Sequence, residues 1–213
     1  MKKYLPFLLI AGVLIISACG TKQEVVKEPV VNNPEPQTIN LGNYLIDSEK
    51  SQINWHAAKI VGNSHDGTVK IKNGSVTLGT ELSEGTIIID MTTIADNENN
   101  ASLIKHLKSD DFFAVDTFPE SKIVIKSITP KTGELNKYEI SGELTIKEKT
   151  NPVNFEVSAL SVNDVITLDG SLTIDRSLWD VRFGSDKFFD NLGDKAISNN
   201  IDYKISIVAN LIK

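Results

Sequence analysis

The sequence predicts an all-β domain built on antiparallel strands, which either close into a barrel or fold into a sandwich. The first observation behind this is that apolar and polar residues alternate over most of the chain after residue 43. The second is that turn signals containing glycine, proline or asparagine separate the alternating stretches. The third is length: residues 43–213 form a stretch of ordinary size for one domain and contain no second linker.

The N-terminus predicts a cleaved signal and a lipid anchor. A basic start, Met1–Lys3, precedes an apolar run over residues 4–16, which is shorter than the roughly 20 residues that span a bilayer. The run ends in Ser17-Ala18-Cys19, which resembles the lipobox of bacterial lipoproteins, and Cys19 is the only cysteine. We expect residues 1–18 to be removed and Cys19 to carry acyl chains, palmitate among them, that hold the protein on a membrane.

Residues 19–42 predict a disordered tether, because they contain three prolines, no aromatic residue and no usable periodicity up to Asn40. Loss of Lys2 and Lys3 with the signal takes the net charge from −6 to about −8, which argues against nucleic acid as a partner. Gly20 resembles an outer-membrane sorting pattern. We therefore expect an envelope protein on the outer membrane with its domain in the periplasm, and surface exposure stays open.

The strands follow from period-two alternation. It is clearest over Tyr138–Lys147, Ile166–Ile174 and Tyr203–Leu211. Shorter stretches predict six more strands, at residues 53–55, 68–71, 76–78, 86–91, 122–128 and 153–157. The turn signals between strands are Asn73-Gly74, Ser83-Glu84-Gly85, Pro130 to Gly133 and Asn151-Pro152.

Two segments break the alternation. Residues 99–107 have helical apolar spacing after an asparagine, which predicts a short helix. Residues 179–194 contain three phenylalanines and two glycines, which predict an aromatic loop or a second helical turn. Both segments are candidate lids of a small barrel.

The residues favour no catalytic, metal or cofactor site. His56, His65 and His106 form no ligand pair with metal-binding spacing. Residues 96–107 lack the glycine and glutamate of a calcium loop, so residues 96–100 predict a turn that starts the helix. Adjacent carboxylates at Asp110-Asp111 point to opposite faces of a strand and seldom converge. The chain has no phosphate loop and no nucleophile elbow.

A set of motifs, in order, resembles the YceI-like family of bacterial envelope proteins, also called polyisoprenoid-binding proteins. The most specific is residues 106–113, His-Leu-Lys-Ser-Asp-Asp-Phe-Phe, followed by Phe118-Pro119. The others are Trp55, His65-Asp66-Gly67, residues 89–94, residues 142–146 and residues 175–179. The resemblance covers about residues 44–213 and implies an extended lipocalin-like antiparallel barrel. The sequence departs from the family at residues 147–153, where a glycine usually stands in the turn.

The resemblance implies binding, storage or transport of a long-chain isoprenoid lipid in an apolar interior, without an enzymatic reaction. We expect that lipid to contact residues of the interior and of a closable mouth. The interior residues are Trp55, Met91, Leu144, Phe155, Leu168 and Leu172. The closable mouth is assigned to Phe112, Phe113, Phe183 and Phe188. Arg176 and His65 are candidate headgroup contacts, although Arg176 could instead pair with Asp175, Asp180 or Asp186.

The residues leave alternatives open. Small residues expected to face inward, Ala57, Gly142 and Gly170, can leave a cavity or accommodate bulky neighbours. A solid core would favour an interaction protein whose exposed loops bind a partner protein. A hydrolase is a third hypothesis, which would need a histidine and a carboxylate to converge at the barrel mouth. The sequence also leaves open whether the protein forms a homodimer.

Overall fold

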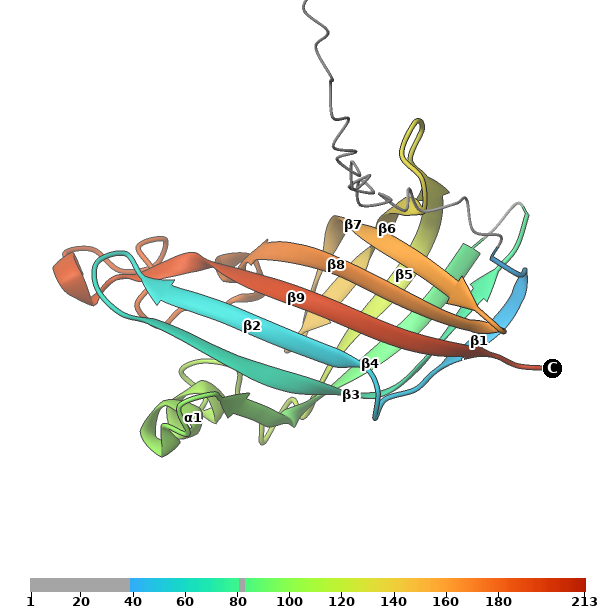
Figure 1. Ribbon diagram of the computed structural model, residues 1–213. Helices are drawn as coiled ribbons and strands as arrows, with labels where there is room; N and C mark the ends of the chain where they lie inside the picture. The colour runs from blue at the N-terminus through green and yellow to red at the C-terminus, as the bar shows by residue number, and fades with distance from the viewer. Residues whose placement is uncertain (1–38, 81–82) are drawn as a thin grey trace, which may run out of the picture. The chain divides into compact units, whose positions relative to one another are not determined.

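The computed structural model describes residues 39–80 and 83–213 (Figure 1). Within these residues lie nine strands: β1 (Gly42–Ile46), β2 (Gln52–Lys59), β3 (Ser64–Leu78), β4 (Ser83–Asp96), β5 (Glu120–Pro130), β6 (Lys137–Ile146), β7 (Lys149–Val162), β8 (Val165–Asp175) and β9 (Ile197–Leu211). The helical segments are α1 (Ala101–Lys108) and the short 3-10 turns η1 (Arg176–Trp179) and η2 (Gly193–Lys195). The signal peptide, Cys19 and most of the tether lie outside the described residues and stay predictions.

The sheet closes on itself. Its strand order is β3-β2-β9-β8-β7-β6-β5-β4, and β4 pairs again with β3, so eight antiparallel strands form a barrel. The short strand β1 pairs with both β3 and β9 beyond the start of β2. Closure leaves no edge strand in the eight-stranded ring, which removes the unpaired backbone groups of an open sheet. The expected all-β class is confirmed, and of the two expected architectures the chain adopts the barrel.

Alternation decides which side chains enter the barrel. On β9, Ile201, Tyr203 and Ile205 face the interior, whereas Asp202 and Lys204 between them are exposed. Successive side chains of a strand point to opposite faces, so one apolar set is buried and one polar set meets water.

The two ends of the barrel are built differently (Figure 1). We call one the closed end: it carries α1, η1, η2 and the long connections over residues 97–119 and 176–196. We call the other the rim: it carries the turns after β3, β5 and β7, residues 39–41 and the C-terminus. Figure 1 shows α1 at one end of the strands and the C-terminus at the other. None of the helices in residues 39–80 and 83–213 is long and apolar enough to cross a membrane.

The expected helix is confirmed as α1. The Asn100 side chain accepts a hydrogen bond from the backbone N–H of Leu103 at 3.0 Å, which caps the first turn. The buried Asp96 carboxylate accepts from the backbone N–H groups of Glu98 and Asn100 at 3.1 and 2.9 Å. The expected role of residues 96–100 as the turn that starts the helix is therefore confirmed.

Three of the predicted turns lie within strands, so these predictions were wrong. Asn73-Gly74 lies inside β3, which runs unbroken from Ser64 to Leu78 with an irregular register near Asn73. Ser83 to Gly85 belong to β4. Asn151-Pro152 lies inside β7.

The β6–β7 turn falls at Lys147-Glu148. There Lys147 adopts φ 55°, the left-handed conformation that a glycine accepts without strain. This explains how the chain makes the turn without the glycine that the family usually has.

Gly67 is required by close packing inside the barrel. A Cβ atom at this position would lie 1.9 Å from the Ala95 carbonyl oxygen and 2.4 Å from the Trp55 ring. We expect Gly67→Ala to lower the free energy of unfolding by about 2–4 kcal/mol, measured by chemical denaturation. The control is Gly193→Asn, at φ 53° in open space, where we expect a change below about 1 kcal/mol. Equal stability of the two variants would contradict this packing argument.

Candidate binding cavity

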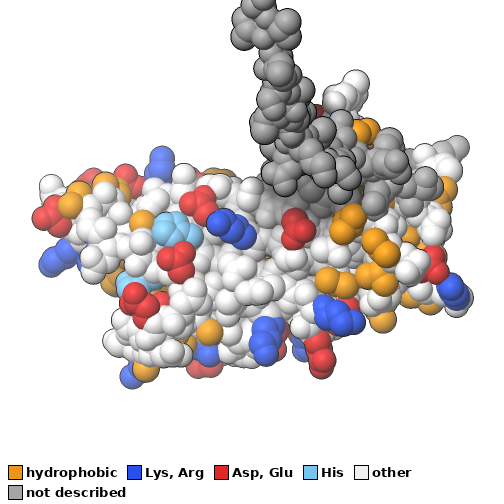
Figure 2. Space-filling view, in the orientation of Figure 1, with side chains coloured by type: hydrophobic (Ala, Val, Ile, Leu, Met, Phe, Trp, Pro, Cys, Tyr) orange, Lys and Arg blue, Asp and Glu red, His pale blue; other side chains and the backbone are white. Residues whose placement is uncertain are grey.

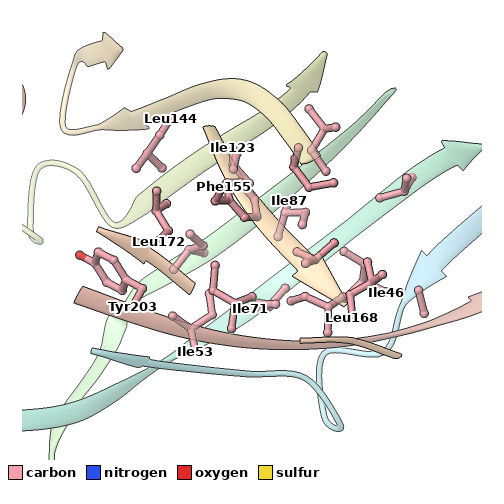
Figure 3. Close-up of a pocket in the computed structure, with 18 of the residues that line it drawn as sticks. Ile46, Ile53, Ile71, Ile87, Ile123, Leu144, Phe155, Leu168, Leu172 and Tyr203 are labelled. Carbon is pink, nitrogen blue, oxygen red and sulfur yellow. The ribbon is translucent and has the colours of Figure 1, made fainter. Parts of the chain in front are cut away.

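The barrel encloses a cavity of about 430 Å³ (Figure 3). Figure 3 shows branched aliphatic side chains from different strands converging on one space, among them Ile53, Ile71, Ile123 and Leu168. Among the described residues that line it, no side chain is charged. A volume of several hundred Å³ is typical of sites that hold drug-sized ligands, and an apolar wall fits an apolar ligand.

Tyr203 is a polar group in the cavity wall. Its phenol is drawn at one end of the cavity view (Figure 3), and its backbone pairs with Trp55 on the neighbouring strand. Burial raises the pKa of the Tyr203 phenol well above its usual value, because phenolate would lose its hydration there. The phenol therefore stays a neutral hydrogen-bonding group that can meet a neutral oxygen of a ligand.

Aromatic side chains fill the closed end of the cavity. Phe112 and Phe113 stack edge-to-face with their ring centres 4.9 Å apart, and both are buried. Leu107 on α1 lines the same end. Trp179 on η1 donates a hydrogen bond from Nε1 to the Leu144 carbonyl at 2.9 Å, which fixes η1 against β6. These contacts close this end against water.

The rim end is open. Leu41, Gly79, Thr80 and Pro130 line the cavity and are exposed to solvent at the same time. They come from the start of the described chain, from the end of β3 and from the end of β5. The cavity therefore opens to solvent between these segments.

The structure places eight of the ten expected lipid contacts on the cavity wall: Trp55, Met91, Phe112, Phe113, Leu144, Phe155, Leu168 and Leu172. Phe183 and Phe188 do not line it. The His106 ring lies 4.2 Å from Phe183, and Arg182 stacks on Phe188, both outside the barrel interior. Phe112 and Phe113 close the end of the cavity opposite the rim, so the role of the four phenylalanines in a closable mouth stays a prediction that this geometry does not favour. Lipid contact by the wall residues stays a prediction.

Arg176 makes no ion pair in the described chain, which corrects the expected pairing with Asp175, Asp180 or Asp186. It is 1% exposed and donates hydrogen bonds to the carbonyl oxygens of Val181, Ile197 and Ser198, at 2.7, 3.2 and 3.0 Å. Burial lowers its pKa, and the nearby carboxylates of Asp175 and Asp186 oppose that shift. Arg176 does not line the cavity, so its visible role is to join η1 to the start of β9.

His65 is also outside the cavity. Its side chain is half-buried, and Nδ1 lies 3.8 Å from Oδ1 of the buried Asp96 carboxylate. Among the described residues, no group of three or more histidine, cysteine or carboxylate side chains gathers in a way that would hold a metal ion. Contact between His65 and a headgroup stays a prediction that this geometry does not favour.

The small inward residues behave differently from one another. Ala57 lines the cavity. A Cβ at Gly170 would lie 2.8 Å from the Val157 side chain, and one at Gly142 would lie 2.6 Å from the Val124 carbonyl oxygen. These two glycines therefore accommodate close neighbours and add no free space. The hollow interior also departs from the packed core on which the interaction-protein hypothesis rests.

The sequence interpretation missed much of the wall. It did not single out branched residues that line the cavity on β2, β3, β4, β5 and β9, such as Ile53, Ile71, Ile87, Ile123 and Ile205. Alternation on β9 was a usable signal, because every second residue lies on the inner face: Ile201, Tyr203, Ile205, Ile207 and Ala209. On β3 and β4 the register shifts change which residues face inward, and sequence spacing alone does not reveal them.

Comparison with known proteins gives one family. Residues 44–209 match the YceI-like domain. A UPF0312 protein of Pseudomonas putida strain W619 is 31% identical over 121 residues, 54% of this chain and 60% of its own length. A UPF0312 protein of Shewanella denitrificans is 29% identical over 131 residues, 57% of this chain and 64% of its own. The matches thus span less than two thirds of these relatives.

Solved structures share the fold. BcnA of Burkholderia cenocepacia is 24% identical with a TM-score of 0.65, over 78% of this chain and 99% of its own. A polyisoprenoid binding domain from Saccharophagus degradans is 11% identical with a TM-score of 0.59, over 81% of this chain and 100% of its own. Together with the match over residues 44–209, the closed barrel and its apolar cavity show that the chain belongs to the YceI-like domain family.

Proposed function

We propose that this protein binds a long-chain isoprenoid lipid inside the barrel and stores, shields or carries it in the bacterial envelope without a catalytic step. The observation that carries the proposal is the cavity, which is apolar, open at the rim and closed at the other end. The description of the Saccharophagus degradans relative as a polyisoprenoid binding domain supports the same ligand class.

Burial of hydrocarbon supplies the affinity. Each methylene removed from water contributes about 0.8 kcal/mol, so ten of them give about 8 kcal/mol before the costs of association. A net gain of that size, after those costs, would correspond to a Kd near 1 μM, so a tightly bound lipid must bury more than ten methylenes. A methyl-branched isoprenoid chain buries more surface per unit length than a straight chain and matches the branched wall.

The uncharged lining constrains the headgroup. The described residues of the cavity wall include no cation. Moving a phosphate into this cavity would therefore cost far more free energy than burial of the hydrocarbon chain supplies. A charged headgroup therefore stays outside at the rim. A neutral one, such as a quinone or an alcohol, can enter and reach the Tyr203 phenol.

Cys19 supplies the attachment in this proposal. Its acyl chains hold the protein on a membrane, where a water-insoluble ligand is present. Anchoring does not require the barrel itself to bind anionic lipids, which its negative charge disfavours. The outer membrane is the proposed location.

Native mass spectrometry tests the function. The full-length chain is expressed with its signal, purified gently from bacterial membranes, and measured before and after organic extraction. We expect one isoprenoid lipid per barrel, released on unfolding, together with a separate mass increase at Cys19. An empty barrel that also takes up neither a polyprenol nor a quinone would overturn the proposal and would point to a protein partner.

A further inference from the structure

We infer that the rim rests on the lipid bilayer, so that the cavity opens directly onto the membrane surface. The inference rests on the function and the anchor proposed above, and it adds the orientation and the docking surface. It is carried by the position of the opening, the side chains around it and the place where the chain arrives from Cys19.

The rim carries exposed apolar side chains that no described neighbour covers. Six of them are 50–57% exposed: Leu41, Leu45, Leu135, Leu160, Val162 and Ile212. They lie just before and within β1, at the β5–β6 turn, at the end of β7 and at the C-terminus, all at the rim end of the barrel. Figure 2 shows hydrophobic side chains gathered on the part of the visible face toward the C-terminus. An apolar ring around an opening is typical of a surface that binds an apolar partner.

The described chain begins at this rim and is held there. The Asn40 side chain donates a hydrogen bond to Asp164 in the β7–β8 turn at 3.0 Å, and Tyr44 donates from its hydroxyl to the Asn40 carbonyl at 2.8 Å. Ile39 lines the cavity beside them. A chain anchored at Cys19 therefore reaches the barrel at its open end.

The length of the connection favours the rim over the closed end. Twenty residues separate Cys19 from Asn40, and a fully extended chain of that length reaches no more than about 70 Å. The fifteen residues of β9 span about 50 Å from the closed end to the rim. Contact between the closed end and the membrane would require the connection to run back along most of the barrel.

The closed end also exposes apolar residues, among them Leu178, Phe183 and Phe188, so exposure alone does not decide the orientation. There the cavity is sealed by Phe112 and Phe113. A membrane contact at that end would give the lipid no path into the barrel. The same residues therefore serve as controls.

The test compares labels at the two ends of the lipid-modified full-length protein. Cys19 is the only cysteine, so once it carries lipid a new cysteine is the single free thiol. An environment-sensitive fluorophore is attached at Leu135→Cys or Leu160→Cys on the rim, and at Leu178→Cys on the closed end. Each protein is reconstituted into vesicles of phosphatidylethanolamine and phosphatidylglycerol that contain nitroxide-labelled lipid.

We expect the rim labels to shift to the blue and to be quenched, as for a group about 5–10 Å inside the interface, and the Leu178 label to stay in water. The double variant with Leu135→Asp and Leu160→Asp is expected to take up lipid from the vesicles about tenfold more slowly. The control Leu178→Asp is expected to leave the rate of uptake unchanged. Quenching of the Leu178 label equal to that of the rim labels would overturn the orientation. If lipid is found inside the barrel in those samples, the proposed function stands and only the orientation fails. If instead the rim labels are quenched but the barrel is empty, the orientation stands and the proposed function fails.

Discussion

Leu168→Trp and Ile205→Trp, separately and together, are expected to abolish uptake of a long-chain lipid while the barrel stays folded. Both side chains line the cavity and are only half-buried, because part of their surface faces the empty interior. A tryptophan at either position can extend into that space without displacing packed neighbours. Each tryptophan ring occupies space that several methylenes of the lipid would otherwise fill. Because burial of one methylene contributes about 0.8 kcal/mol, the affinity for the lipid is expected to fall more than about 100-fold.

The matched control is Lys204→Trp, which adds the same ring to the outer face of β9 beside Ile205. Binding is measured by titrating delipidated protein with a polyprenol and counting bound lipid by native mass spectrometry. Circular dichroism verifies the fold of all variants. Unchanged binding by the double variant would mean that the lipid does not occupy this cavity.

Arg176→Met is expected to destabilise the protein by about 2–4 kcal/mol. The substitution keeps most of the apolar stem but removes the donors to the carbonyl oxygens of Val181, Ile197 and Ser198. A buried carbonyl left without a donor costs about 1–3 kcal/mol of stability. Part of this loss is offset, because the methionine variant no longer has a buried cation with its desolvation cost. The closed end would open first, because these bonds join η1 to β9.

Chemical denaturation measures the loss, with Arg182→Met as the control. Arg182 is exposed and pairs with Asp180 at 2.6 Å, so its removal is expected to change the free energy of unfolding by less than about 1 kcal/mol. Similar small effects for both arginines would show that the buried hydrogen bonds contribute little.

The barrel was predictable because its signal is local and repeated. Alternation on β6, β8 and β9 and the helix cap at Asn100 each appear in the sequence where the structure has them. Strand β1 was missed because Tyr44, Leu45 and Ile46 are consecutive apolar residues, so its sequence does not alternate although its burial does. The unbroken β3 was divided in two because Asn73-Gly74 looks like a turn, whereas β1 and β4 on either side keep it extended.

The cavity was less predictable, because it depends on which side chains meet across the barrel. The sequence identified Phe155 and Leu168 as inward residues but did not show whether neighbours fill the space beside them. It also identified Phe112 and Phe113 as part of a lid without indicating which end they cover. Their position depends on the buried cluster that they share with Trp179, which lies far from them in the sequence.

Photo-crosslinking tests the central claim, that the hydrocarbon chain lies inside the barrel. The full-length protein is loaded with an isoprenoid carrying a diazirine near the middle of its chain, irradiated, and digested for peptide mapping by mass spectrometry. The account predicts crosslinks on cavity-facing residues such as Phe155, Leu168 and Ile205, and none on the outward-facing Lys204. Crosslinks confined to outward-facing residues, with the cavity wall unlabelled, would contradict it.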